Sequence, residues 1–415
     1  MTTKLLIRNA HLLDPAQPCL QDRHDILVEG DTIREVSDRP IAPGDAQVID
    51  AGGRTVMPGL IDLHVHVVAV DLDLPRQARM PNVLVTLRSL PILRGMLRRG
   101  FTTVRDAGGA SQAFKQAVEA GLAQGPRLFV SGRALSQTGG HGDGRPRTDT
   151  LAADGICPTC ARVGAIARVA DGVDAVRRAV REELQMGADQ IKVMASGGVA
   201  SPTDPIDALG YSEDELRAIV QEATSRGTYV MAHAYTAAAI ARAVRCGVRT
   251  IEHGNLVDAQ AAALMARLGS YAVPTLVTYD ALAGEGARLG LPPDSVAKVA
   301  QVREAGLRSL EIFRTAGVKM GFGSDLLGAS HRLQSEELRL RAQVLSPAEV
   351  IASATVIGAQ VLGMEDRLGR LVPGALADLL LVDGDPLRSL DCLLGQGEGI
   401  ALVMKAGTVE FDARP

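Results

Sequence analysis

Hydrophobic and polar residues alternate along this 415-residue chain in a pattern that changes character near residue 58. Before that point, short apolar segments at 4–9, 25–28, 32–36 and 47–50 are separated by turn sequences, which is typical of β-strands. β character returns near the other end, at 377–382, 402–405 and 409–410. We therefore predict that residues 1–57 and 365–415 pair into one small β domain.

Between these ends, residues 58–364 show apolar runs of strand length that alternate with helical stretches. The predicted strands are 60–66, 102–106, 128–131, 190–194, 229–233, 250–253, 271–273 and 319–325. The main predicted helices are 171–186, 212–226, 236–246, 258–268, 294–316 and 346–362, with N-caps at Asp171, Ser212, Asp258 and Ser346. Eight β/α alternations favour an α/β fold with a closed (β/α)8 TIM barrel. An open doubly wound sheet is the alternative, but no G-x-G-x-x-G turn follows the first strand.

A long segment at 134–170, after the third predicted strand, is rich in Gly, Pro, Asp and Arg and has no regular pattern. Loops of that length are commonly functional or disordered. The segment contains Cys157 and Cys160 in a C-x-x-C arrangement, which could bind zinc or cycle between redox states. Because no second Cys/His pair lies nearby in the sequence, we interpret it as an ordinary loop or a local disulfide.

Polar side chains lie at or near the carboxyl ends of five of the eight predicted strands. Two of them form His-x-His at the end of the first strand, and residues i and i+2 of a strand point to the same face. The full set is His64, His66, Lys192, His233, His253 and Asp325. Each alone has a structural explanation, such as a buried hydrogen bond or a helix cap. Since barrel active sites lie at the carboxyl ends of the strands, the set together predicts a metal site there.

The composition narrows the class of protein. Apolar residues make up 46% of the chain and aromatic residues only 3%, so the core must be aliphatic. A net charge of −4 and a pI near 6.1 argue against a nucleic acid or an anionic membrane as partner. Neither a signal-peptide h-region nor an apolar run of membrane-spanning length is evident. We expect a cytoplasmic protein that acts on a small molecule.

The order His-x-His, Lys, His, His and Asp resembles the amidohydrolase superfamily of metal-dependent hydrolases, and the resemblance runs from about residue 5 to 409. It implies a distorted (β/α)8 barrel with a β-sandwich domain built from both termini. It also implies two divalent ions, usually zinc, bridged by an N-carboxylated Lys192 and a hydroxide. His64, His66 and Asp325 would bind one ion, and His233 and His253 the other.

The chemistry of these residues suits that assignment. Burial disfavours the ammonium of a lysine in an apolar strand, and the neutral amine of Lys192 can then take up CO₂. Two cations lower the pKa of a shared water, which supplies a nucleophilic hydroxide at neutral pH. Asp325 can act as the general base and pass the proton to the leaving amine.

Five further motifs resemble one branch of that superfamily, which contains Xaa-Pro and Xaa-Arg/Lys dipeptidases and ochratoxin-hydrolysing amidases. They are Gly139-Gly140-His141-Gly142-Asp143, Ile191-Lys192-Val193-Met194-Ala195-Ser196-Gly197-Gly198-Val199, His233-Ala234-Tyr235-Thr236, Ile251-Glu252-His253-Gly254-Asn255 and Pro274-Thr275-Leu276. The resemblance implies that His141 contacts the scissile carbonyl oxygen and that Tyr235 meets the free carboxylate of the substrate. It also implies a homo-oligomer, for which an octamer is plausible.

We therefore predict a binuclear-metal amidohydrolase that cleaves the amide bond to a C-terminal amino acid in dipeptides or N-acyl amino acids. Ochratoxin A is a candidate substrate. One alternative on the same scaffold is a hydrolase of a cyclic amide such as an imidazolone, or of a carbamate or phosphotriester. The other alternative is a non-catalytic assembly protein.

Overall fold

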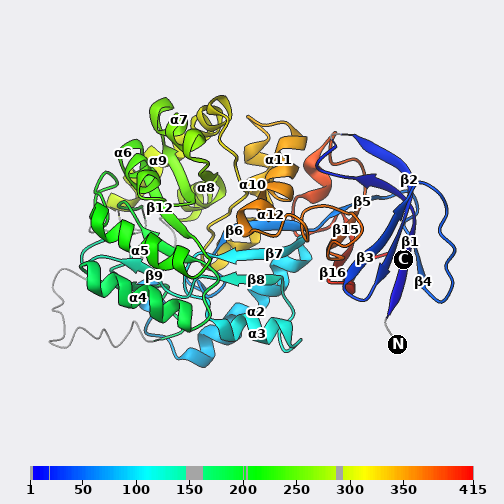
Figure 1. The fold of residues 1–415 in the computed structure, drawn as a ribbon, viewed down its shortest axis with the longest axis horizontal. Coiled ribbons are helices and arrows are strands. Elements are labelled where there is room, and N and C mark those ends of the chain that lie inside the picture. Colours follow the sequence, from blue (N-terminus) through cyan, green and yellow to red (C-terminus); the bar gives the residue numbers. More distant parts are fainter. Residues whose placement is uncertain are drawn as a thin grey trace.

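The protein, described by a computed structural model, consists of a barrel of strands and helices joined to a separate sheet (Figure 1). The structure describes residues 3–17, 19–145, 162–199, 201, 204–286 and 293–414. Cys157 and Cys160, and with them the prediction for the C-x-x-C pair, lie outside these residues. Within the described residues, no helix is long and apolar enough to cross a membrane.

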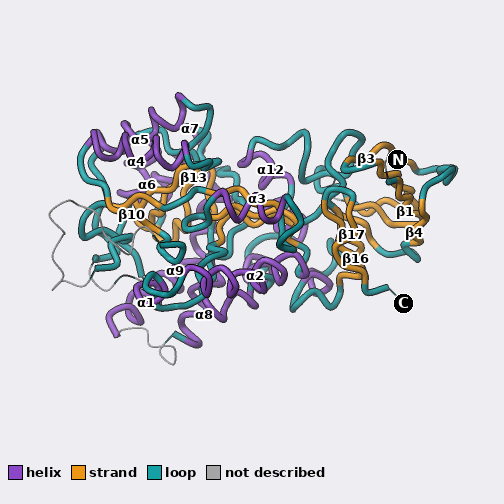
Figure 2. The backbone as a smooth tube through the Cα atoms, turned by 90° about the horizontal axis from the view of Figure 1, so that it is seen from below, coloured by secondary structure: helices purple, strands orange, loops and turns teal. Residues whose placement is uncertain are grey.

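Strands from both ends of the chain form one eight-stranded sheet, as the sequence predicted. The strands are β1 (Lys4–Leu13), β2 (Leu20–Glu29), β3 (Thr32–Ser37), β4 (Gln47–Asp50), β5 (Thr55–Pro58), β15 (Leu379–Val382), β16 (Ile400–Lys405) and β17 (Thr408–Asp412). β5 and β15 join the two halves in an antiparallel ladder in which Met57 lies opposite Leu380. Aliphatic side chains from both halves, such as Ile7 and Leu402, share one core. Both chain ends therefore lie on this sheet (Figure 2).

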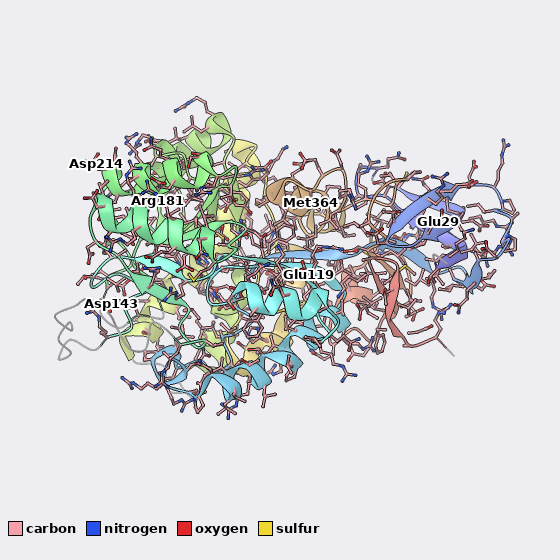
Figure 3. All side chains as sticks on the ribbon, turned by 60° about the horizontal axis from the view of Figure 1, so that its bottom comes forward. Glu29, Glu119, Asp143, Arg181, Asp214 and Met364 are labelled. Carbon is pink, nitrogen blue, oxygen red and sulfur yellow. The ribbon has the colours of Figure 1, made fainter. Side chains whose placement is uncertain are left out.

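The barrel strands run parallel to one another, as a (β/α)8 fold requires. They are β6 (Leu60–Val65), β7 (Phe101–Asp106), β8 (Arg127–Val130), β11 (Ile191–Met194), β12 (Val230–Thr236), β13 (Thr250–Leu256) and β14 (Tyr271–Val273). The helices around them are α1 (Leu74–Gln77), α2 (Asn82–Arg98), α3 (Gln112–Glu119), α4 (Val173–Gln185), α5 (Glu213–Ser225), α6 (Ala237–Arg245), α7 (Ala259–Leu268), α8 (Leu276–Glu285) and α9 (Pro293–Ala316). Charged side chains such as Arg181 and Asp214 cover the outer helices (Figure 3).

The predicted eighth strand, 319–325, is an extended segment with a single bridge, between Met320 and Ala272. The segment hydrogen-bonds to β14 first and to β6 afterwards, where the amide of Asp325 donates to the carbonyl of His64 at 2.8 Å. A Cβ on Gly321 would lie 2.3 Å from the side chain of Leu63, so the glycine permits this close passage. Because its partners change along its length, the segment closes the barrel without forming a regular ladder.

Other predicted elements differ in detail. The insertion predicted to lack regular structure begins and ends with two short parallel strands, β9 (Ala134–Ser136) and β10 (Ala167–Val169). Asp171 is not the N-cap of α4, which is Gly172; its carboxylate instead accepts from the amide and hydroxyl of Thr138 in the insertion.

The predicted helix at 346–362 is two helices, α11 (Pro347–Ser353) and α12 (Val356–Leu362), because Thr355 between them leaves the helical conformation. The remaining helical segments are η1 (Gly328–Leu333), α10 (Glu336–Arg341) and η2 (Leu390–Leu393). The predicted N-caps Ser212, Asp258 and Ser346 are confirmed, and the two serines form complete capping boxes.

Candidate metal centre and active site

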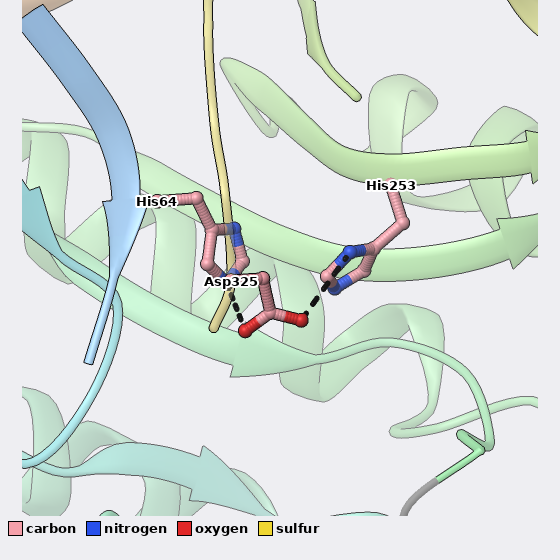
Figure 4. A group of neighbouring side chains, drawn as sticks. All are labelled: His64, His253 and Asp325. Carbon is pink, nitrogen blue, oxygen red and sulfur yellow. Dashed lines mark ion pairs between the residues drawn. The ribbon is translucent and has the colours of Figure 1, made fainter. Parts of the chain in front are cut away.

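Asp325 lies between three histidines from two strand ends, those of β6 and β13, at the mouth of the barrel. One of its oxygens is 3.4 Å from Nε2 of His64 and 3.3 Å from Nε2 of His66, and the other is 3.9 Å from His253. One ligand atom from each of His64, His253 and Asp325 lies within 4.8 Å of the others, which is close enough for a shared ion. Figure 4 shows the two imidazoles on opposite sides of the carboxylate.

The backbone at two of these positions is unusual. His253 has φ +69° and Asp325 has φ +52°, in the left-handed region that residues other than glycine rarely adopt. Such conformations cost roughly 1–3 kcal/mol each and persist where the surrounding structure imposes them, commonly at functional sites. At the carboxyl end of the barrel, they turn both side chains toward the same point.

The orientation of the histidines fits a metal site. Nδ1 of His64 hydrogen-bonds to the carboxylate of Glu252 at 2.7 Å, and Nδ1 of His66 to the carbonyl of Gly108 at 2.8 Å. Fixing one ring nitrogen in this way is the usual arrangement for a metal-ligating histidine, because it sets the tautomer and leaves the other nitrogen free. Nε2 of His64 is buried and has no hydrogen-bond partner among the described residues. An ion between these nitrogens and Asp325 would satisfy it.

The electrostatics of the cluster agree with that fit. Burial lowers the pKa of His233 and of His253 well below the usual value, so both imidazoles are neutral and able to coordinate a cation. Burial by itself would raise the pKa of Asp325, but the neighbouring His64 and His66 hold it well below its usual range. Asp325 is therefore an ionised carboxylate.

Lys192 projects from β11 and is 1% exposed. Desolvation lowers the pKa of its amine to about 8, so a substantial fraction is neutral near physiological pH. His233, on the adjacent strand β12, hydrogen-bonds through Nε2 to the carbonyl of Gly197 at 3.1 Å, and its ring centroid is 4.6 Å from that of His253. All six predicted metal ligands therefore lie at one end of the barrel.

The structure also brings His141 to this cluster. Its ring stacks on that of His233, with centroids 4.5 Å apart and an angle of 20° between the planes. Tyr235, at the end of β12, is buried between the rings of His233 and His253, and its hydroxyl hydrogen-bonds to the hydroxyl of Tyr279 at 2.8 Å. No motif in the sequence singles out Tyr279, which is one of the buried residues of α8, the helix after β14.

Glu252 on β13 is a second buried group beside the cluster, and the sequence alone assigned it no role. Its carboxylate binds His64 on one side and, at 2.9 Å, the guanidinium of Arg105 on the other, and both charged residues are 0% exposed. Burial by itself would raise the pKa of Glu252, but Arg105 and His64 lower it to about 2. The available signal in the sequence was a carboxylate inside a predicted strand, directly before His253. Glu252 thus fixes the orientation of His64.

Glu252→Gln is expected to weaken binding of Zn²⁺ by about 10–100-fold, because the carboxylate no longer orients His64 or strengthens it as a ligand. The dissociation constant can be measured by competition with a chromophoric chelator. Glu183→Gln on α4 is the matched control, since Glu183 is 2% exposed and pairs with Arg168 and Arg133 on the outside of the barrel. Equal affinities for the two variants would contradict the assignment.

A parallel (β/α)8 barrel with histidines, a lysine and an aspartate converging at the carboxyl ends of its strands defines the class of metal-dependent hydrolases that act on C–N bonds. Residues 55–409 match the amidohydrolase family. The chain belongs to this family.

Several similar proteins refine the comparison. An amidohydrolase of known crystal structure has 70% sequence identity to this chain and superposes on it with a TM-score of 0.96, and the match covers 98% of each chain. A prolidase complexed with N-methylphosphonate-L-proline is 57% identical, with a TM-score of 0.96, covering 98% of this chain and 99% of the other. Ochratoxinase from Aspergillus niger is 31% identical over 362 residues, which are 85% of this chain and 75% of the relative.

Proposed function

We propose that this protein hydrolyses the amide bond to a C-terminal amino acid in dipeptides or N-acyl amino acids. The observation that carries the proposal is the likeness, over nearly the full length of both chains, to a prolidase complexed with a phosphonate derivative of proline. Dipeptides of the Xaa-Pro type are therefore the first substrates to test. The similarity to ochratoxinase makes ochratoxin A a second candidate.

In this proposal, the barrel of residues 58–364 holds two divalent ions, with zinc as the first candidate. His64, His66 and Asp325 would hold one ion, His233 and His253 the other, and Lys192 would lie between them as a carbamate. The carbamate would form when the neutral amine attacks the carbon of CO₂. An N–C bond forms, one C–O π bond of CO₂ opens with its electron pair going to oxygen, and the amine loses one proton, which gives an anionic ligand. When bound, two such ions lower the pKa of a shared water and polarise the amide carbonyl.

The protein's own residues would move the protons. Asp325 is ionised and lies at the centre of the cluster, so it can accept a proton from the attacking water. The same carboxyl group then donates that proton to the nitrogen of the leaving amino acid as the C–N bond breaks. Its two oxygens face different histidines, which is consistent with a group that serves both sides of the reaction.

Substrate recognition would fall to the residues beside the cluster. An N–H of His141 would donate to the carbonyl oxygen as negative charge develops on it, which stabilises the tetrahedral species. Tyr235 and Tyr279 share a hydrogen bond in which one hydroxyl accepts, so the accepting phenol keeps a proton to donate to the substrate carboxylate. We further propose that the protein acts in the cytoplasm as a homo-oligomer, with an octamer as the first expectation.

A release assay tests the proposal. Purified protein is incubated with a panel of Xaa-Pro, Xaa-Arg and Xaa-Lys dipeptides, N-acyl amino acids and ochratoxin A, and free amino acid is quantified. We expect turnover of at least one group, with loss after chelation and recovery when Zn²⁺ is restored. Ring opening of a cyclic amide without any amino-acid release would instead support the alternative hydrolase.

Metal analysis of the same sample addresses the non-catalytic alternative. If the protein is a binuclear amidohydrolase, we expect about two tightly bound divalent ions per chain, because the six predicted ligand residues converge at one end of the barrel. A pure sample without bound metal and without chelator-sensitive activity would favour an assembly protein.

A further inference from the structure

The ring of His141 packs against Gly198, in the loop that follows β11. A Cβ on Gly198 would lie 2.0 Å from Cε1 of His141, far inside van der Waals contact, so the ring occupies space that only a glycine leaves. The amide of Gly198 donates to Oδ2 of Asp204 at 2.8 Å. The described residues of this loop thus place a carboxylate next to the edge of the imidazole.

Asp204 is 4% exposed, and its Oδ2 lies 3.6 Å from Nδ1 of His141. That nitrogen is buried and has no hydrogen-bond partner with good geometry among the described residues. The carboxylate is therefore the group placed to hold Nδ1 when a substrate draws the ring into its working position. With Nδ1 held, Nε2 is the nitrogen left to face a ligand.

Lys298 anchors the same loop from α9. Its ammonium contacts three backbone carbonyls, those of Gly198 at 3.3 Å, Ser201 at 2.8 Å and Asp204 at 2.5 Å. An ammonium has three donor directions, and these contacts can use all of them. Lys298 therefore ties the backbone at Gly198, Ser201 and Asp204 to α9, roughly 100 residues further along the chain than Gly198.

We propose that Asp204 and Lys298 are positioning residues for His141. Lys298 holds the backbone at Asp204 in place, and Asp204 fixes the orientation of the imidazole toward the carbonyl oxygen of the substrate. This inference rests on the proposed function of His141, and it adds two residues that the metal ligands do not require. Loss of either should reduce stabilisation of the transition state while the ions and ground-state binding are retained.

The test compares Asp204→Asn and Lys298→Met with Lys115→Met, a control lysine on α3 that pairs with Asp189 at 2.7 Å near the opposite end of the barrel. For the dipeptide that the wild-type protein cleaves best, we expect kcat to fall about 10–100-fold in the two test variants, with KM changed by less than about 3-fold. Metal content should equal that of the wild type. Lys298→Arg, which keeps a cation with several donors, should recover part of the loss.

A double-mutant cycle with His141→Ala separates positioning from general damage. In that background, Asp204→Asn and Lys298→Met should each lower kcat by less than about 3-fold, because the group they position is gone. Undiminished effects in the His141→Ala background, or variants that match Lys115→Met, would overturn the inference. If Lys298→Met does not fold, the Asp204→Asn cycle decides. A wild-type protein that cleaves no substrate would refute the proposed function instead, so the two failures are distinguishable.

Discussion

Asp325→Asn is expected to lower kcat by about 10³-fold or more, the largest effect we expect from an isosteric change in this protein. The substitution keeps the size of the side chain but removes the negative charge that lies 3.3–3.4 Å from two histidines. It also removes the group proposed to carry the proton from the water to the leaving amine. An amide cannot accept that proton at neutral pH, so both halves of the transfer are lost.

Steady-state kinetics and metal analysis of the same sample test this prediction. Asp189→Asn is a suitable control, because Asp189 pairs with Lys115 near the start of β11, away from the mouth of the barrel. Its turnover should stay within about 2-fold of the wild type. Near-normal kcat in Asp325→Asn, with metal bound, would show that the carboxylate neither shuttles the proton nor holds an essential ion.

Lys192→Ala is expected to reduce activity by several orders of magnitude through a different cause. The side chain is 1% exposed and projects from within the short apolar strand β11, so no other described lysine shares its place among the histidines. Without it, the ions lose the anionic group proposed to lie between them, and at least one ion should bind much more weakly. Metal content should therefore fall together with kcat.

Two further measurements make this prediction specific. Lys192→Met keeps most of the length of the side chain but has no amine to react with CO₂, so it should be as inactive as the alanine variant. A short carboxylic acid such as propionate, added at high concentration to Lys192→Ala, can enter the vacated space and supply the missing carboxylate. Recovery of activity and metal in the alanine variant, but not in the methionine variant, is the expected pattern. Near-normal kcat in Lys192→Met would contradict a carbamate.

The alternation of apolar runs and helices was sufficient to predict the barrel and the shared terminal sheet, because each depends on local patterns repeated many times. The same pattern gave wrong predictions where contacts between distant parts of the chain determine the local structure. The segment ending at Asp325 has the composition of a strand, yet its neighbours change along its length and no regular ladder forms. Asp171 has the sequence of a helix cap, but Thr138 of the insertion competes for its carboxylate.

The candidate site divides in the same way. Residues that close consecutive strands could be predicted together, since the geometry of a barrel brings strand ends to one place. Glu252 binds His64 across 188 positions of sequence, and Lys298 reaches a loop almost 100 residues earlier. No periodicity encodes such pairings. They depend on which side chains meet once the barrel has closed, and only the structure shows them.

The ladder between β5 and β15 has a consequence for biosynthesis. Met57 pairs with Leu380, which is synthesised 323 positions later, so the terminal sheet cannot form completely before then. Closing so large a loop is slow and entropically costly, whereas the barrel is built from contacts closer in sequence. During translation, the first strands therefore stay without their final edge partner until the barrel has left the ribosome. An unpaired edge is prone to aggregate, so expression yield should be most sensitive to substitutions in β5.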